Sequence, residues 1–273
     1  MADREIALEG LSTLCNSGVT FFQQGESASR RSIGTQLFLR DLYDAVLDAE
    51  DNSPWSEFVF QNLRNVLLGL DGAPKLGTRR LRGGYSDKLT GKNYIIKEEE
   101  FFDSQFDYDF TTVTDSKTFW RGGEEYERPC GWQRFALKVL DKYGENKWLG
   151  NQKRETRSVP GEWPVSYHGT SKRGAKGIIK EGYEPGPREK YGRGIYSTPY
   201  IAEAEQYAKT FTSKKNGKQY KVILQNRINP KYRLKYNKEK YWLIPIEDGS
   251  SSDDEKEIVE KAIRPYGLLL KEV

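Results

Sequence analysis

The side chains best suited to chemistry gather in the C-terminal half of the chain, and the only histidine opens the series. Tyr167-His168-Gly169-Thr170 follows a short apolar run and is expected at the end of a strand. Ligands often bind at the carboxyl ends of strands, and a glycine lets a ligand approach the backbone closely. A lone histidine after a strand also fits a structural role. Any reaction that needs a histidine must use His168, because the chain has no other.

A second candidate segment is residues 191–199, with the sequence YGRGIYSTP. It is not the dinucleotide fingerprint GxGxxG, because no third glycine completes the spacing. Tyr196 closes the glycine-rich part, and Tyr207 follows in a predicted helix. Two tyrosines on separate elements can flank a flat ring, a geometry worth ~0.5–1.5 kcal/mol beyond burial. Core packing is the alternative interpretation for each tyrosine taken alone.

Taken in order, these segments resemble the catalytic domain of the diphtheria-toxin-like ADP-ribosyltransferases, the PARP superfamily. Residues 168–170 are similar to that family's His-Gly-Ser/Thr, and residues 191–196 to its Phe-Gly-Lys-Gly-Ile-Tyr. Tyr207 falls at the family's second tyrosine. Residues 220–230 resemble the long central strand and residues 263–270 the closing strand. The combination is specific, whereas no single segment is.

The resemblance implies a role for each matching residue. The Gly169 backbone would hold the nicotinamide carboxamide, and His168 would bind the adenosine ribose hydroxyls. Thr170 would lie near a ribose, Tyr207 would stack on nicotinamide, and Tyr196 would line the opposite wall. The NAD⁺-binding residues implied in this way are His168, Gly169, Thr170, Tyr196, Ser197, Ala204 and Tyr207. The implied catalytic residues are His168, Tyr196 and Tyr241.

The chemistry implied by the resemblance is cleavage of the nicotinamide–ribose bond of NAD⁺ through an oxocarbenium-like transition state. Such a transition state depends on orientation, exclusion of water and electrostatics suited to developing positive charge. NAD⁺ is the substrate, and no metal is implied. A cysteine and histidine zinc site needs about four ligands, and this chain has one histidine and two distant cysteines.

Two positions depart from the family pattern. Ala204 replaces the serine often found three residues before the stacking tyrosine, so a hydrogen bond worth ~1 kcal/mol would be missing. Polymerising members carry a glutamate where the strand pattern here places Tyr241. A shift of one residue would place Lys240 there, and a shift of two would place Glu239. A His-Tyr-Tyr set resembles mono-ADP-ribosylating members.

The leading prediction is therefore a mono-ADP-ribosyltransferase, with a protein side chain as acceptor and nucleic acid as the less favoured acceptor. The connector 231–240, which helps to hold the acceptor in the family, is short, so the acceptor cannot be inferred. A short acceptor loop also suits an NAD⁺ glycohydrolase, in which water takes the ribosyl group. The absence of the glutamate and of the serine also fits an inactive module that binds NAD⁺ or a partner.

Composition predicts a folded protein without a membrane span. Hydrophobic residues make up 36% of the chain and aromatic residues 13%, too many aromatics for a disordered chain. No apolar run approaches the ~20 residues that span a membrane, and the acidic, mixed N-terminus is not a secretory signal. Cys15 and Cys130 do not make a disulfide framework. The expected location is the cytoplasm, with the nucleus left open.

The net charge of +4 is mild. Basic residues cluster at Lys75, Arg79, Arg80 and Arg82 and again at Lys214, Lys215 and Lys218. Neighbouring glycines and polar residues favour solvated loops at both clusters over a phosphate or nucleic-acid patch.

The expected fold class is α+β, with ADP-ribosyltransferase-like split antiparallel sheets, flanking helices and a smaller, mostly helical N-terminal region. Residues 1–92 are predicted to be that helical region and its linker, 93–160 a connecting segment packed on the core, and 161–273 the catalytic domain. Apolar spacing predicts helices at 37–49 and from Pro54 to about 70, residues 1–35 loosely structured, and 71–92 a linker.

Further along the chain, alternation of aromatic and acidic residues predicts a strand within 93–120, and 131–140 is expected to be a strand or a helix. The second half is predicted to hold strands at 165–168, 194–197, 220–228, 241–246 and 267–270. Helices are expected at 172–181 and 200–210, and loops at 182–192 and 247–255.

Overall fold

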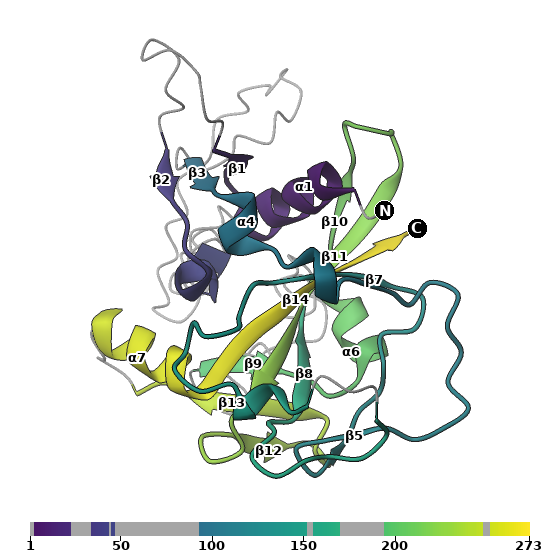
Figure 1. Ribbon diagram of the computed structural model, residues 1–273, viewed down its shortest axis with the longest axis vertical. Helices are drawn as coiled ribbons and strands as arrows, with labels where there is room; N and C mark the ends of the chain where they lie inside the picture. Colours follow the sequence, from purple (N-terminus) through teal and green to yellow (C-terminus); the bar gives the residue numbers. More distant parts are fainter. Residues whose placement is uncertain are drawn as a thin grey trace, which may run out of the picture.

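Strongly apolar strands near the C-terminus form the centre of the molecule. The computed structural model describes residues 3–22, 34–43, 45–46, 93–151, 155–169, 194–247 and 252–273. Within these residues the fold is mixed α and β, with several antiparallel sheets and few helices (Figure 1). The α+β class predicted from the sequence is therefore confirmed.

The central sheet is built on β11 (Gln219–Ile228) and β14 (Ile263–Glu272), which pair antiparallel along most of their length. β10 pairs with the first half of β11, and β8 pairs with the second half on the same edge. The other members are β10 (Lys209–Thr212), β8 (Val165–His168), β7 (Gln133–Ala136) and β4 (Tyr108–Asp109). β7 pairs with the outer edge of β14, so residues 133–136 belong to the central sheet.

Both faces of the central sheet are covered by apolar side chains. Leu268 and Leu270 of β14 join the larger core, whereas Leu269 between them joins a second core. β11 follows the same alternation, with Val222 and Leu224 in the larger core and Ile223 in the second. Alternate residues of each strand therefore face opposite cores, as expected for a sheet that is buried on both faces.

Helix α1 (Arg4–Cys15) covers the larger core, where the sequence predicted loosely structured chain. That prediction was wrong, because Gly10, Ser12 and Thr13 obscure a helical apolar face. A Cβ on Gly10 would lie 3.0 Å from Leu270 Cδ2, so the glycine allows the helix to approach the sheet. The helix buries Ile6, Ala7, Gly10, Leu11, Leu14 and Cys15.

A second, three-stranded antiparallel sheet has the order β12-β13-β9 (Figure 1). Its strands are β9 (Gly194–Ser197), β12 (Leu234–Tyr236) and β13 (Tyr241–Pro245). Two backbone hydrogen bonds between Tyr167 and Thr198, of 2.8 and 3.0 Å, join it to β8 of the central sheet. The end of β8 therefore lies where the two sheets meet.

Beyond α1, the described N-terminal part contains strands that the prediction of a mostly helical region did not include. A three-stranded parallel sheet forms from β1 (Gly18–Phe21), β2 (Thr35–Gln36) and β3 (Asn93–Ile96). The predicted helix 37–49 begins as the 3₁₀ turn η2 (Leu39–Asp41), and residues 42–43 and 45–46 are helical. The predicted helix 54–70 and linker 71–92 lie outside the described residues.

The strand predicted within 93–120 was only partly correct. After β3 the chain forms the short helix α4 (Glu98–Phe101), the 3₁₀ turn η3 (Ser104–Phe106) and then β4. The alternation of Phe106, Tyr108 and Phe110 therefore spans a turn and a two-residue strand. Packing against β7 overrides the local pattern, because Tyr108 pairs with Arg134 there.

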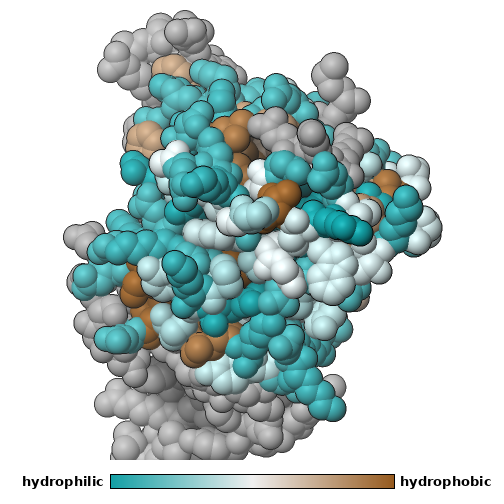
Figure 2. All heavy atoms as spheres, turned by 60° about the horizontal axis from the view of Figure 1, so that its bottom comes forward, coloured by the Kyte–Doolittle hydropathy of each residue, from teal (hydrophilic) through white to brown (hydrophobic). Residues whose placement is uncertain are grey.

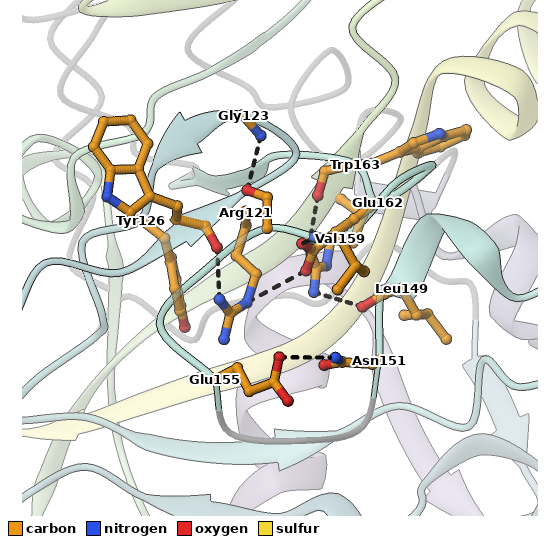
Figure 3. A network of polar contacts seen from close by, with 12 residues as sticks. Arg121, Gly123, Tyr126, Leu149, Asn151, Glu155, Val159, Glu162 and Trp163 are labelled. Carbon is orange, nitrogen blue, oxygen red and sulfur yellow. Dashed lines mark hydrogen bonds and ion pairs between the residues drawn. The ribbon is translucent and has the colours of Figure 1, made fainter.

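Turns in residues 137–151 and 155–163 form a connector, which a buried ionic network attaches to the central sheet (Figure 3). The Glu162 carboxylate lies 3.1 Å from Arg227 Nη1 and 3.3 Å from Arg121 Nε. Arg227, on β11, also donates to the carbonyls of Trp163 and Leu149, at 2.6 and 2.8 Å. The network joins the 3₁₀ turn η4 (Lys147–Leu149), β11 and β5 (Trp120–Arg121), which pairs with β6 (Glu124–Glu125).

Other predicted elements of the second half were confirmed with shifted ends. Strands 165–168 and 194–197 agree with β8 and β9, and 241–246 ends one residue earlier in the structure. The predicted helix 200–210 is shorter, since α6 (Ile201–Gln206) gives way to β10 at Lys209. The predicted loop 247–255 overlaps the helix α7 (Ser252–Ala262). The predicted helix 172–181 and loop 182–192 lie outside the described residues, and the three-part domain division stays a prediction.

The basic cluster at 214–218 occupies a turn between β10 and β11, as expected. Lys215 lies 2.9 Å from Asp3 and 2.7 Å from Glu5, and Lys218 lies 2.9 Å from Glu272. These carboxylates raise the pKa of both lysines and balance their charge. The cluster at 75–82 lies outside the described residues. No helix among the described residues is long and apolar enough to cross a membrane.

Candidate functional site

His168 ends β8 with its side chain in the interior, 7% exposed. Its Nδ1 lies 2.7 Å from the Tyr196 carbonyl oxygen. A carbonyl can only accept, so Nδ1 carries a proton and Nε2 of the neutral ring is an acceptor. Burial lowers the pKa of His168 and outweighs the opposing effect of the Tyr196 hydrogen bond. The imidazole is therefore neutral at pH 7, with its orientation fixed from β9.

Gly169 brings the backbone after His168 against the C-terminal end of α6. A Cβ at this position would lie 2.4 Å from the Ala204 carbonyl oxygen and 3.1 Å from Tyr207 Cβ. Real Cβ atoms do not approach backbone so closely, so this contact requires glycine. Ala204 itself is buried, and Tyr207 follows the helix as its half-exposed C-cap.

Tyr196 and Ser197 lie on β9 but on opposite faces of it, because side chains alternate along a strand. Tyr196 is half-buried and pairs with Leu243, whereas Ser197 is buried and pairs with Trp242. The two side chains therefore do not line one wall together. Tyr196 contributes in addition through its carbonyl, which holds His168.

Tyr241 begins β13, and its hydroxyl donates to Glu203 Oε1 on α6 at 2.6 Å. Burial, the hydrogen bond to Glu203 and the neighbouring Tyr207 phenol raise the pKa of Tyr241 far above its ordinary value. Of the three residues considered for the third position, Lys240 pairs with Glu203 at 2.7 Å and Glu239 with Lys235 at 3.1 Å. Only Tyr241 of the three makes a described contact with Tyr207.

Glu203 is a residue that the sequence reasoning missed. It is 5% exposed and lies beside the buried Ile201 and Ala204 in α6. The available signal was a carboxylate placed among the apolar positions of a short predicted helix, since charged residues are almost never fully buried unless paired. Glu203 brings a carboxylate to Tyr241 from α6, where the family pattern suggested one on the strand.

Tyr43 was also missed, because it comes from the N-terminal part of the chain. Its ring centroid lies 5.7 Å from that of His168, with the rings tilted by 60°. The side chain is 1% exposed, and its hydroxyl makes no hydrogen bond in the described structure. Burial raises its pKa well above the ordinary value. No sequence pattern links residues so distant, so only the fold could reveal this contact.

The structure therefore brings His168, Gly169, Ala204, Tyr207 and Tyr241 to one place, where β8, α6 and β13 converge. Thr170 lies outside the described residues. No group of three or more His, Cys, Asp or Glu residues within the described ranges could hold a metal ion. The arrangement offers a neutral imidazole, a close-packed glycine backbone and two neighbouring phenols.

Comparison with known proteins gives no assignment. No protein-family model matches the chain, and no curated protein matches it.

Proposed function

We propose that this chain transfers ADP-ribose from NAD⁺ to an acceptor and releases nicotinamide. The observation that carries the proposal is the contact of Gly169 with the end of α6, beside a histidine fixed by the Tyr196 carbonyl. The backbone of residue 169 thereby lies next to Tyr207, as a nicotinamide held by its carboxamide and stacked on a tyrosine would require. This proposal extends the resemblance of the His-Gly-Thr and Gly-Ile-Tyr segments to the PARP superfamily.

In the proposed mechanism His168 orients the substrate. Its neutral ring presents Nε2 as an acceptor for a ribose hydroxyl, while Nδ1 donates to Tyr196. Tyr207 would stack on the nicotinamide ring, and Tyr196 would face it from β9. Fixing the two halves of NAD⁺ in this way aligns the C1′–nitrogen bond for cleavage, and orientation of this kind can supply much of the rate acceleration.

Transfer of a single ADP-ribose unit is the form of the reaction that we propose. Position 241 holds a tyrosine rather than a glutamate, in keeping with the mono-ADP-ribosylating members that the chain resembles. A protein side chain is the proposed acceptor, and nucleic acid is less favoured. On the face in Figure 2 the coloured hydrophobic residues are scattered among hydrophilic ones.

The test is incubation of the purified chain with labelled NAD⁺, with and without cell lysate. Nicotinamide release and label on protein are followed for the wild type, His168→Ala and a surface control, Lys218→Ala. Labelled protein that depends on His168 and carries one unit per site supports the proposal. Free ADP-ribose without labelled protein would instead identify an NAD⁺ glycohydrolase. Absence of both, together with no NAD⁺ binding, would refute the proposal.

A further inference from the structure

The two oxygens of the Glu203 carboxylate contact different neighbours. Oε1 accepts the Tyr241 hydroxyl at 2.6 Å. Oε2 lies 2.7 Å from Lys240 Nζ and 3.4 Å from Gln206 Nε2. The Glu203 side chain is 6% exposed, whereas that of Lys240 is 42% exposed. One oxygen therefore faces a partly buried phenol and the other an ammonium group that reaches solvent.

The Tyr241 hydroxyl has only one proton, and it gives that proton to Glu203. A phenol oxygen can accept more than one hydrogen bond, so the Tyr241 oxygen can also accept from a bound substrate. An anionic partner makes that oxygen a better acceptor than an isolated phenol would be.

The turn between β12 and β13 holds this arrangement in place. Asn237, Lys238 and Glu239 all have positive φ angles, of 49°, 52° and 68°, and the Lys240 amide donates to the Asn237 carbonyl at 3.1 Å. Three successive left-handed residues are uncommon outside glycine and sharply reverse the chain. The reversal delivers Lys240 and Tyr241, neighbours in sequence, to the same carboxylate.

We propose that Glu203 is a positioning residue of the NAD⁺ site that acts through Tyr241 and serves an acceptor bearing an O–H group. The inference rests on the proposed function, and it adds the acceptor class and the route of the acceptor's proton. A carboxylate acceptor is already deprotonated and needs no such route, whereas a hydroxyl or water must lose a proton when it attacks.

The reaction balances as follows. The bond between C1′ and the nicotinamide nitrogen breaks, and its electron pair leaves with nicotinamide. The acceptor oxygen forms a bond to C1′ and passes its proton to the Tyr241 oxygen, while Tyr241 passes its own proton to Glu203 Oε1. Glu203 then releases the proton to solvent on its Lys240 side. NAD⁺ and the acceptor alcohol thus give the ADP-ribosylated acceptor, nicotinamide and a proton.

The experiment compares Glu203→Gln with Glu205→Gln in the full chain. Glu205 is a matched control, because it lies on the same helix and pairs with Lys221 and Lys271, both at 2.8 Å, with no described contact to Tyr241. We expect Glu203→Gln to lower kcat by about 100-fold, the range for loss of a general base, with KM changed less than about threefold. Glu205→Gln should retain the wild-type kcat.

Tyr241→Phe and the double variant Glu203→Gln/Tyr241→Phe test whether the two residues act as one unit. The double variant should be no slower than the slower single variant, because residues in one relay are not additive. The label should resist hydroxylamine, which cleaves carboxylate esters of ADP-ribose. ADP-ribose formed from water alone also supports the inference, since water is an O–H acceptor.

Equal kcat values for Glu203→Gln and Glu205→Gln would overturn the inference while leaving the proposed function standing, provided that His168→Ala is inactive. If hydroxylamine removes the label, the inference is likewise overturned and the proposed function still stands. A wild-type chain that does not bind NAD⁺ would overturn the proposed function and this inference together. Thermal unfolding of each variant shows whether a loss of turnover reflects a loss of fold.

Discussion

Two buried glutamates in this molecule have opposite surroundings. Glu162 is enclosed by Arg121 and Arg227, and its second oxygen accepts from the Val159 amide at 3.2 Å (Figure 3). Glu203 has no arginine partner and instead contacts a phenol, the Gln206 amide and one partly exposed lysine. Arg227, with its 7% exposed side chain, cannot leave its partner without being stranded, whereas Lys240 can turn to solvent.

The surroundings of Glu162 suit a role in stabilising the fold, whereas those of Glu203 suit a role in proton transfer. A carboxylate fixed by two guanidinium groups and an amide cannot take part in proton transfer without disturbing the fold. A carboxylate linked to a phenol can exchange a proton with little movement. Glu162, in the connector, is therefore held by buried cations, whereas Glu203, at the candidate site, has partners that allow it to exchange a proton.

The largest expected effect in this comparison is on folding, at Glu162. Glu162→Ala would leave Arg227 buried without its anion, and breaking a buried pair costs about 3–5 kcal/mol. Denaturant unfolding should show this loss, whereas Glu155→Ala, at an exposed position, should change stability by less than about 0.5 kcal/mol. Equal effects of the two substitutions would refute the structural role of the network.

Gly169→Ala should have the next largest effect, and this effect should be on the candidate site rather than on the connector. The new Cβ would meet the Ala204 carbonyl oxygen at 2.4 Å, so β8 or α6 must move. Overpacking of this kind costs about 1–3 kcal/mol. NAD⁺ affinity, measured by calorimetry, should fall by at least about tenfold. Gly123→Ala is a control for replacing a glycine away from the site, since a Cβ there meets nothing within 4 Å. Unchanged affinity in Gly169→Ala would refute the contact.

The pH dependence of NAD⁺ binding should be set by His168. Burial lowers the pKa of this imidazole below its ordinary value of 6.5, so the neutral form persists at pH 6.5 and is lost only in more acid solution. Affinity should stay level from alkaline pH down to 6.5 and fall below it. Stability follows the same sign, because the unfolded chain takes up the proton first as the pH falls. The loss is at most ~1.4 kcal/mol per pH unit.

NMR titration of the single histidine gives a direct reading of that pKa. A His168 resonance that titrates above pH 6.5 would contradict the burial argument. His168→Gln should remove the acid limb of the stability profile, which separates this residue from the carboxylates that titrate at lower pH.

The sequence predicted the strands of the second half well, because β11 and β13 carry continuous apolar runs, and β8 and β9 are short segments bounded by glycine or proline. The ligand-binding role of Gly169 and the catalytic role of Tyr241, both implied by the family resemblance, stay predictions, whereas the packing of Gly169 against α6 was not foreseen. The sequence missed α1, since Gly10 hides the helical face, and it missed Glu203 and Tyr43. Those two residues reach the site through tertiary contacts that no local spacing records.

The smallest expected effect is at Tyr43, which lies in the N-terminal part of the chain and contacts His168. Its hydroxyl is buried without a hydrogen bond in the described structure, so Tyr43→Phe removes an unsatisfied group and keeps the ring against His168. Stability should be unchanged or rise by up to ~1 kcal/mol. Tyr43→Ala should instead lower both stability and NAD⁺ affinity, because His168 loses its neighbour. If Tyr43→Phe weakens NAD⁺ binding as much as Tyr43→Ala does, the hydroxyl itself contacts the ligand, and the N-terminal part contributes a polar group to the site.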